Sequence, residues 1–323
     1  MLSRYFLPFL LLLTPNILVI FLCATVHSHS VDNNEREEDG AYRPRDHDHY
    51  NDVEHNVEFD HEAIIGSVKE AEEFDRLSPE ESRQRLQKLL YRMDLNGDQF
   101  ISRPELKKWI LNSFINLSKE EAEERMSEAD EHRDGIVTWQ EYVRDTFGVD
   151  GDDLDATDDA DAGMMLQEKT MWQAADIDGN GVLNFEEFSV FTNPEEHPQM
   201  HALLVNQTLR ERDANNDSVL DFGEYVGDRG VQQDKEWVLS ERDKFEHELD
   251  SNRDGVLDAA EVHRWVIPDN GEIADDEVEH LFAAADDDHD GALSFAEVLR
   301  HHDVFVGSEA DYDHDHDRFD DEL

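Results

Sequence analysis

Apolar residues recur at helical spacing along this chain, in short stretches on either side of polar, acid-rich segments. Leu86, Leu89, Leu90 and Met93 recur at intervals of three and four, which places them on one face of an α-helix. A second stretch with this spacing, residues 106–110, follows the polar segment. The pattern predicts a helix, a polar loop and a second helix.

The polar segments are related by an internal repeat. Each has twelve residues, opens with Asp and closes with Glu, and the intervals between them are 36, 46, 37, 37 and 36 residues. Such a period indicates one structural unit per repeat, with a single insertion. The eighth position is always apolar, which a random acidic run would not maintain: Ile101, Val137, Leu183, Leu220, Leu257 and Leu293.

Oxygen-bearing side chains within each segment have the spacing of a Ca²⁺-binding EF-hand loop. Ca²⁺ prefers about six to eight oxygens, which such a loop supplies from positions 1, 3, 5, 7 (a backbone carbonyl), 9 and 12 (a bidentate Glu). Four loops also have Gly at position 6, where the chain turns sharply, and three of these, the third, fifth and sixth, have an oxygen-bearing side chain at every expected side-chain ligand position. Their predicted ligands are Asp176, Asp178, Asn180, Val182, Asn184 and Glu187 in the third loop, Asp250, Asn252, Asp254, Val256, Asp258 and Glu261 in the fifth, and Asp286, Asp288, Asp290, Ala292, Ser294 and Glu297 in the sixth.

The other three loops depart from this pattern. Gln99 and Ser218 stand at position 6 of the first and fourth loops, where we expect backbone strain of about 1 kcal/mol. His132 stands at position 3 of the second loop, and an imidazole nitrogen is a poor substitute for oxygen on Ca²⁺, so this site should be the weakest. The predicted ligands are Asp94, Asn96, Asp98, Phe100, Ser102 and Glu105 in the first loop, Asp130, His132, Asp134, Ile136, Thr138 and Glu141 in the second, and Asp213, Asn215, Asp217, Val219, Asp221 and Glu224 in the fourth.

These elements predict an all-α protein of six EF-hand helix-loop-helix units, arranged as three paired lobes with short β bridges between paired loops. We expect consecutive hands to pair, which places hands 1 and 2 in residues 75–150, hands 3 and 4 in 164–230, and hands 5 and 6 in 236–305. The remaining ranges are predicted to be a disordered acidic and His-rich segment (29–74), an acidic linker (151–163) and an acidic tail (306–323).

The N-terminus indicates the secretory pathway. A short basic start is followed by an almost wholly apolar stretch, 5–23, and by the small residues Val26 and Ser28, which is typical of a cleaved signal peptide, here residues 1–28. An uncleaved membrane anchor is the alternative, but Pro8 and Pro15 interrupt the apolar stretch, so we expect no stable membrane insertion. Cys23 is the single cysteine, and the mature chain would have no disulfide.

The C-terminus, Asp320 followed by Asp-Glu-Leu, resembles the endoplasmic reticulum retrieval signal, with Asp320 in place of the usual basic residue. We therefore expect the retrieval receptor to be a partner, and residence in the lumen with some secretion. Glycosylation sequons occur at Asn116, Asn206 and Asn216, of which Asn116, between two hands, is the best candidate.

The charge balance favours cation binding. The chain has 81 acidic and 28 basic residues, a net charge of −53, so it attracts Ca²⁺ and repels nucleic acid. We find no nucleophile motif, zinc-protease motif or phosphate-binding loop, and we do not expect an enzyme.

Histidines concentrate near both ends of the chain. His47, His49, His55 and His61 lie in the acidic N-terminal segment, and His314 and His316 alternate with Asp in the tail. This composition is compatible with Zn²⁺ or Cu²⁺ capture. The alternative, which we favour from sequence, is a solvated disordered tract, since alternation without an apolar framework does not fix coordination geometry.

Beyond the loops, the chain resembles the CREC family, the reticulocalbin and calumenin group of EF-hand proteins of the secretory pathway. The landmarks are the stretches 59–63, 77–82, 197–198, 265–268 and 305–308. The resemblance implies a low-affinity Ca²⁺-binding protein of the lumen of the endoplasmic reticulum, which buffers Ca²⁺ and acts as a chaperone or regulator of client proteins. The alternatives are a calcium sensor, which the seven Met residues support poorly, and a secreted acidic calcium-binding protein with an extracellular structural role.

Overall fold

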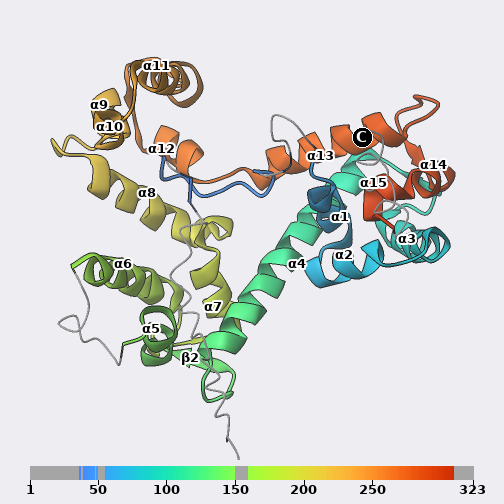
Figure 1. Cartoon of the computed structure of the whole chain (residues 1–323), viewed down its shortest axis with the longest axis horizontal. Coiled ribbons are helices and arrows are strands. Elements are labelled where there is room, and N and C mark those ends of the chain that lie inside the picture. Colours follow the sequence, from blue (N-terminus) through green and yellow to red (C-terminus); the bar gives the residue numbers. More distant parts are fainter. Residues whose placement is uncertain (1–35, 38, 48, 50–54, 150–158, 309–323) are drawn as a thin grey trace, which may run out of the picture.

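Helices dominate the computed structural model, which describes residues 36–37, 39–47, 49, 55–149 and 159–308 (Figure 1). The signal peptide predicted over 1–28 and the tail beyond residue 308 lie outside the described residues. Each acidic loop lies between two helical segments and ends in a short strand. The prediction of an all-α EF-hand array is confirmed.

Hands 1 and 2 share one helix, whereas hand 3 has two helices of its own. Hand 1 is α3 (Pro79–Met93), β1 (Phe100–Ile101) and α4 (Arg103–Ala129); hand 2 is α4, β2 (Ile136–Thr138) and α5 (Trp139–Phe147); hand 3 is α6 (Asp159–Ala175), β3 (Val182–Asn184) and α7 (Phe185–Thr192). Helix α6 begins within the range predicted as linker, 151–163, so the last residues of that range are helical.

The last three hands follow after the short 3₁₀ helix η3 (Pro194–Glu196). Hand 4 is α8 (Pro198–Arg212), β4 (Leu220–Asp221) and α9 (Phe222–Val226), followed by α10 (Arg229–Gln232). Hand 5 is α11 (Lys235–Lys244) with the π-helical turn η4 (Phe245–Leu249), β5 (Val256–Leu257) and α12 (Ala259–Val266). Hand 6 is α13 (Asn270–Ala285), β6 (Leu293–Ser294), α14 (Phe295–Arg300) and α15 (His302–Val306).

The loops pair in three antiparallel bridges, but not as consecutive hands. Strand β1 pairs with β6, β2 with β3, and β4 with β5. The apolar residues at position 8 stand opposite one another in these pairs: Ile101 with Leu293, Val137 with Leu183, and Leu220 with Leu257. The prediction of short β bridges between paired loops is confirmed, whereas the pairing of hand 1 with 2, 3 with 4 and 5 with 6 is wrong.

Helix α4 explains the different pairing. It serves both hand 1 and hand 2 as one continuous helix of 27 residues, which at 1.5 Å per residue is about 40 Å long. Loops 1 and 2 therefore lie at its opposite ends, too far apart to pair. Figure 1 shows α4 running between two separated groups of helices, and loop 1 meets loop 6 from the far end of the sequence.

Two hydrophobic cores form among the described residues. One core joins hands 1 and 6 and includes Phe114 and Phe282, while the other runs through hands 2 to 5 and includes Trp172 and Tyr225. The chain thus folds with its outer hands in one body and its four central hands in another. No helix within the described ranges is both long enough and apolar enough to cross a membrane.

The segment predicted to be disordered, 29–74, is partly ordered and packed. It contains α1 (Val57–Ile65) and α2 (Val68–Asp75). Ahead of them lies the N-terminal segment, by which we mean the described residues between 36 and 49. In this segment, the backbone N–H of Tyr42 donates to the Val266 carbonyl (2.8 Å), and buried Asp39 accepts from Lys244 (2.8 Å). Hydrogen bonds to residues far along the chain hold it in place, which local composition did not reveal.

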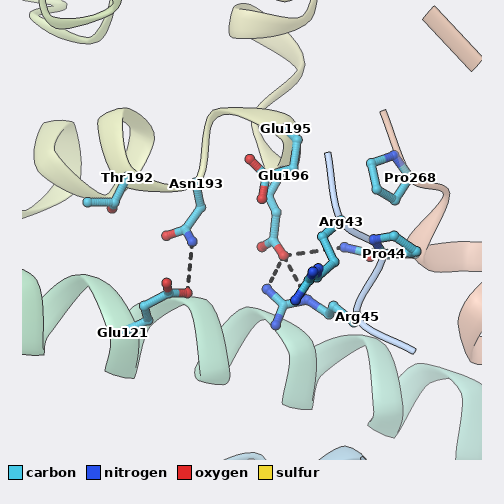
Figure 2. Close-up of a pocket in the computed structure, with 10 residues that line it drawn as sticks. Arg43, Pro44, Arg45, Glu121, Thr192, Asn193, Glu195, Glu196 and Pro268 are labelled. Carbon is cyan, nitrogen blue, oxygen red and sulfur yellow. Dashed lines mark hydrogen bonds and ion pairs between the residues drawn. The ribbon is translucent and has the colours of Figure 1, made fainter. Parts of the chain in front are cut away.

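The N-terminal segment also lines a cleft between the two bodies. Figure 2 shows Arg45 reaching Glu196, whose carboxylate accepts from Arg45 Nε (2.9 Å). Three residues before Glu196, on the same segment, Asn193 donates to Glu121 of α4 (3.1 Å). The ion pair of Arg45 and the amide of Asn193 therefore connect the segment after α7 to the N-terminal segment and to α4.

Candidate calcium sites

Loop 3 shows how the acidic residues organise the turn. The carboxylate of Asp176, at position 1, accepts from the backbone N–H groups of Asn180 (3.0 Å) and Gly181 (2.8 Å). The carboxylate of Asp178 also accepts from the N–H of Asn180 (3.0 Å). These bonds curl the loop so that its oxygen-bearing side chains lie toward one centre.

Glutamate at position 12 also accepts hydrogen bonds from two backbone N–H groups of its own loop, besides its predicted role as a ligand. In loop 3, Glu187 Oε2 accepts from the N–H of Asn184 (3.2 Å), and Oε1 accepts from the N–H of Ile177 (3.0 Å). The first bond forms a capping box with the Asn184 side chain, which closes the N-terminus of α7. The same box recurs at position 9 and 12 of all six loops, so one sequence pattern both starts a helix and holds a potential ligand.

Most of the position 12 carboxylates are buried. Glu261 is only 2% exposed and Glu105 8%. Although burial opposes ionisation, hydrogen bonds from Ser102 and from loop N–H groups lower the pKa of Glu105 below its usual value. A buried, ionised carboxylate within a ring of oxygens fits a hard divalent cation such as Ca²⁺.

Four of the six loops bring acidic ligands into a tight cluster. One oxygen from each member lies within 4.8 Å of the others in four groups, which are Asp176, Asp178 and Glu187 in loop 3, Asp213, Asp217 and Glu224 in loop 4, Asp250, Asp254 and Glu261 in loop 5, and Asp286, Asp288 and Asp290 in loop 6. Within the part of the chain that the structure describes, loops 1 and 2 do not form such a group. The full ligand sets remain predictions, supported best in loops 3 to 6.

All six loops adopt the same turn, including those without glycine at position 6. The φ angle there is 68° at Gln99 and 70° at Ser218, close to the 85° of Gly181. These two side chains therefore occupy the left-handed region that glycine favours. The structure bears out the geometric reason for expecting strain at these positions.

Position 4 has a positive φ as well, which the sequence analysis missed. Non-glycine residues adopt it in four loops, for example Arg253 (φ 62°) and His289 (φ 58°). Gly97 and Gly179 at this position in loops 1 and 3 were the available signal. Two left-handed residues in one loop explain why its acidic side chains turn inward.

Loop 2 differs because its histidine contacts its own glutamate. His132 Nδ1 forms a hydrogen bond with Glu141 Oε1. Burial alone would raise the pKa of Glu141, but its contacts with His132 and Thr138 lower this pKa to about 2. The same contact with Glu141 raises the pKa of His132. Ca²⁺ would have to displace this imidazole from a principal ligand, which supports the prediction that site 2 is the weakest.

Comparisons with known proteins agree with this geometry. Models of the EF-hand domain pair match residues 83–146 and 242–301, and a second EF-hand pair model matches residues 169–194. Reticulocalbin-2 of Crotalus adamanteus is 35% identical over 267 residues, which cover 80% of this chain and 87% of the relative. Reticulocalbin-2 of Mus musculus is 35% identical over 272 residues (81% and 85%), and reticulocalbin-3 of Mus musculus is 36% identical over 285 residues (85% and 87%). The family resemblance seen in the sequence landmarks is confirmed.

Proposed function

The chain belongs to the reticulocalbin family of EF-hand calcium-binding proteins of the secretory pathway, and from that premise we propose that it buffers Ca²⁺ with low affinity in the lumen of the endoplasmic reticulum. The observation that carries this proposal is the clustering of carboxylates in loops 3 to 6 within EF-hand turns. Loops 1 and 2 have the same turn without the cluster, so they should fill at higher concentrations.

The charge of the chain supports a buffering role that is coupled to folding. With a net charge of −53, repulsion among carboxylates opposes compaction of the calcium-free chain. Each Ca²⁺ removes part of that repulsion and binds residues that the folded loop brings together, so binding stabilises the folded state. Six ions would still leave the chain strongly anionic, which leaves surface charge for contacts with basic segments of client proteins.

Calcium titration of the purified mature chain tests the binding proposal. We expect calorimetric saturation and a gain of helix by circular dichroism at roughly 10⁻⁴ to 10⁻³ M Ca²⁺, the range of low-affinity extracellular EF-hand modules. A titration with Mg²⁺ is the control, because Mg²⁺ demands a smaller octahedral shell. Absence of any change up to roughly 5 mM Ca²⁺, above the upper limit of this range, would contradict the proposal.

We further propose that the retrieval receptor holds the chain in the lumen through its C-terminal Asp-Glu-Leu. Deletion of residues 321–323 should move the protein into the medium, and Asp320→Lys should increase the retained fraction because it restores the usual basic residue. A deletion of equal length within the tail, residues 311–313, is the matched control. If the intact chain were secreted as fully as the 321–323 deletion, the alternative function, a secreted structural calcium-binding protein, would replace this one.

A role toward client proteins completes the proposal. The expected activity is Ca²⁺-dependent binding or chaperoning of secretory proteins, which the family resemblance implies. Cross-linking in the lumen with and without calcium depletion should give adducts that depend on Ca²⁺. Adducts of equal yield in both conditions would restrict the function to buffering.

A further inference from the structure

A cluster of histidines lies outside the EF-hand loops, where the outer hands meet the N-terminal segment. His49 comes from that segment, His55 from just before α1, Asp60 from α1, and His280 from α13. One ligand atom of each lies within 4.8 Å of the others. From the sequence, His49 and His55 were compatible with Zn²⁺ or Cu²⁺ capture, but a solvated disordered tract was favoured, and His280, more than two hundred residues away, was not considered.

The three imidazoles surround one carboxylate. Asp60 Oδ1 is 2.6 Å from His49 Nε2, and Asp60 Oδ2 is 3.3 Å from His55 Nε2 and 3.4 Å from His280 Nε2. The Nε2 atoms of His49 and His55 are 2.9 Å apart. A tetrahedral Zn²⁺ with ligands at its usual bond lengths has ligand–ligand distances of about 3.3 Å, so the cluster needs only small shifts to coordinate one ion.

The surroundings of the cluster favour a structural site. Asp60 is fully buried, His49 is 3% exposed, and the Phe59 ring packs against the His49 ring with centroids 4.6 Å apart. Three imidazoles with a carboxylate are a donor set for Zn²⁺, whereas Ca²⁺ requires oxygens.

A second buried carboxylate faces the same cluster. Glu277, one turn before His280 on α13, is 2% exposed, and neither carboxylate oxygen has a hydrogen-bond partner among the described residues. Its Oε2 lies 3.9 Å from His49 Nε2. A divalent cation at the cluster would place positive charge beside this buried carboxylate, which has no hydrogen-bond donor among the described residues.

We propose that His49, His55, Asp60 and His280 bind one Zn²⁺ ion, which fastens the N-terminal segment and α1 to α13. Helix α13 leads into loop 6, and α1 packs on α4 and α15, so the ion crosslinks the body formed by hands 1 and 6. Four protein ligands close the coordination shell, which is the arrangement of structural rather than catalytic zinc. This site is independent of the six calcium loops.

Zinc titration of the full mature chain in saturating Ca²⁺ tests the proposal, because Ca²⁺ then occupies the oxygen sites. We expect one Zn²⁺ per chain by calorimetry and by metal analysis after desalting, with a higher melting temperature. Co²⁺ in place of Zn²⁺ should give the intense visible absorption of tetrahedral coordination. His55→Ala and His280→Ala, at side chains 31% and 24% exposed, should each weaken Zn²⁺ binding at least tenfold, about 1.4 kcal/mol.

Two control variants separate this site from other histidines. His201→Ala/His263→Ala removes a histidine pair in the other body (Nδ1 to Nε2, 3.1 Å), and His314→Ala/His316→Ala removes the histidines of the tail. Both should keep the tight Zn²⁺ site and the Co²⁺ spectrum. Calcium-induced circular dichroism checks that each variant folds, and His55→Ala decides the result if His280→Ala does not fold. Absence of a tight site, an octahedral Co²⁺ spectrum, or loss of Zn²⁺ binding in a control rather than in His55→Ala would overturn the proposal.

Discussion

In loop 5, Glu261 Oε1 accepts a hydrogen bond from the backbone N–H of Asn252 (3.1 Å), whereas in loop 2 the corresponding oxygen of Glu141 contacts the imidazole of His132. The scaffolds of the two loops are otherwise alike: each has a capping box, and the apolar residue at position 8, Val137 or Leu257, is fully buried. The comparison teaches that folding of an EF-hand and its capacity to bind Ca²⁺ depend on different residues.

The largest effect should come from breaking the shared scaffold. Leu257→Ala removes a side chain that is 0% exposed and stands opposite Leu220, so we expect a loss of about 2–5 kcal/mol in the free energy of unfolding. Leu95→Ala, the same change at a side chain 59% exposed, should alter it by about 0.5 kcal/mol or less. Val137→Ala should destabilise loop 2 in the same direction. Denaturant unfolding in Ca²⁺ measures all three, and equal effects of Leu257→Ala and Leu95→Ala would contradict the role of position 8.

A smaller effect should come from the ligands, and it should differ between the loops. Glu261→Gln removes the charge of a clustered carboxylate and should weaken one Ca²⁺ site at least tenfold, about 1.4 kcal/mol. Glu141→Gln should change total binding less, because His132 already competes for that oxygen. Equilibrium dialysis counts the bound ions in each variant. An equal loss from the two variants would show that Ca²⁺ displaces His132 without difficulty.

Replacement of the histidine in loop 2 by a carboxylate should strengthen Ca²⁺ binding rather than weaken it. His132→Asp places a carboxylate at position 3 and frees Glu141 Oε1, so we expect tighter binding at this site by up to about tenfold. His289→Asp adds the same charge at a position 4 residue of loop 6, which is not a predicted ligand, and serves as the matched control. Calorimetry compares the two, and equal gains would mean that overall charge rather than ligand geometry governs affinity.

The smallest effect should come from backbone strain. Ser218→Gly relieves a positive φ of 70° and should stabilise the calcium-loaded chain by about 0.5–1 kcal/mol. Ser251→Gly in loop 5, where φ is not positive, should stabilise nothing and cost a few tenths of a kcal/mol. Thermal melting of both variants tests this. A destabilising Ser218→Gly would mean that the Ser218 side chain makes a contact worth more than the strain.

The sequence by itself determined the local units. Acidic residues at alternate positions, an apolar residue at position 8 and Glu at position 12 specify the loop, and the same Glu completes the capping box of the following helix. Each of these interactions spans twelve residues or fewer, so their spacing is visible in the chain. The departures from the pattern are also local. Gln99 and Ser218 have a positive φ, and His132 contacts Glu141 of its own loop.

Only the tertiary structure decided which units meet. Hand pairing depends on the uninterrupted length of α4, which separates loops 1 and 2 and lets loop 6 return to loop 1. The order of the N-terminal segment likewise depends on distant partners, since Asp39 contacts Lys244 and Arg45 contacts Glu196. The histidine cluster joins His49 and His280 through the same long-range packing. Local composition does not predict these long-range contacts, because they form when separate helices bury apolar surface against one another.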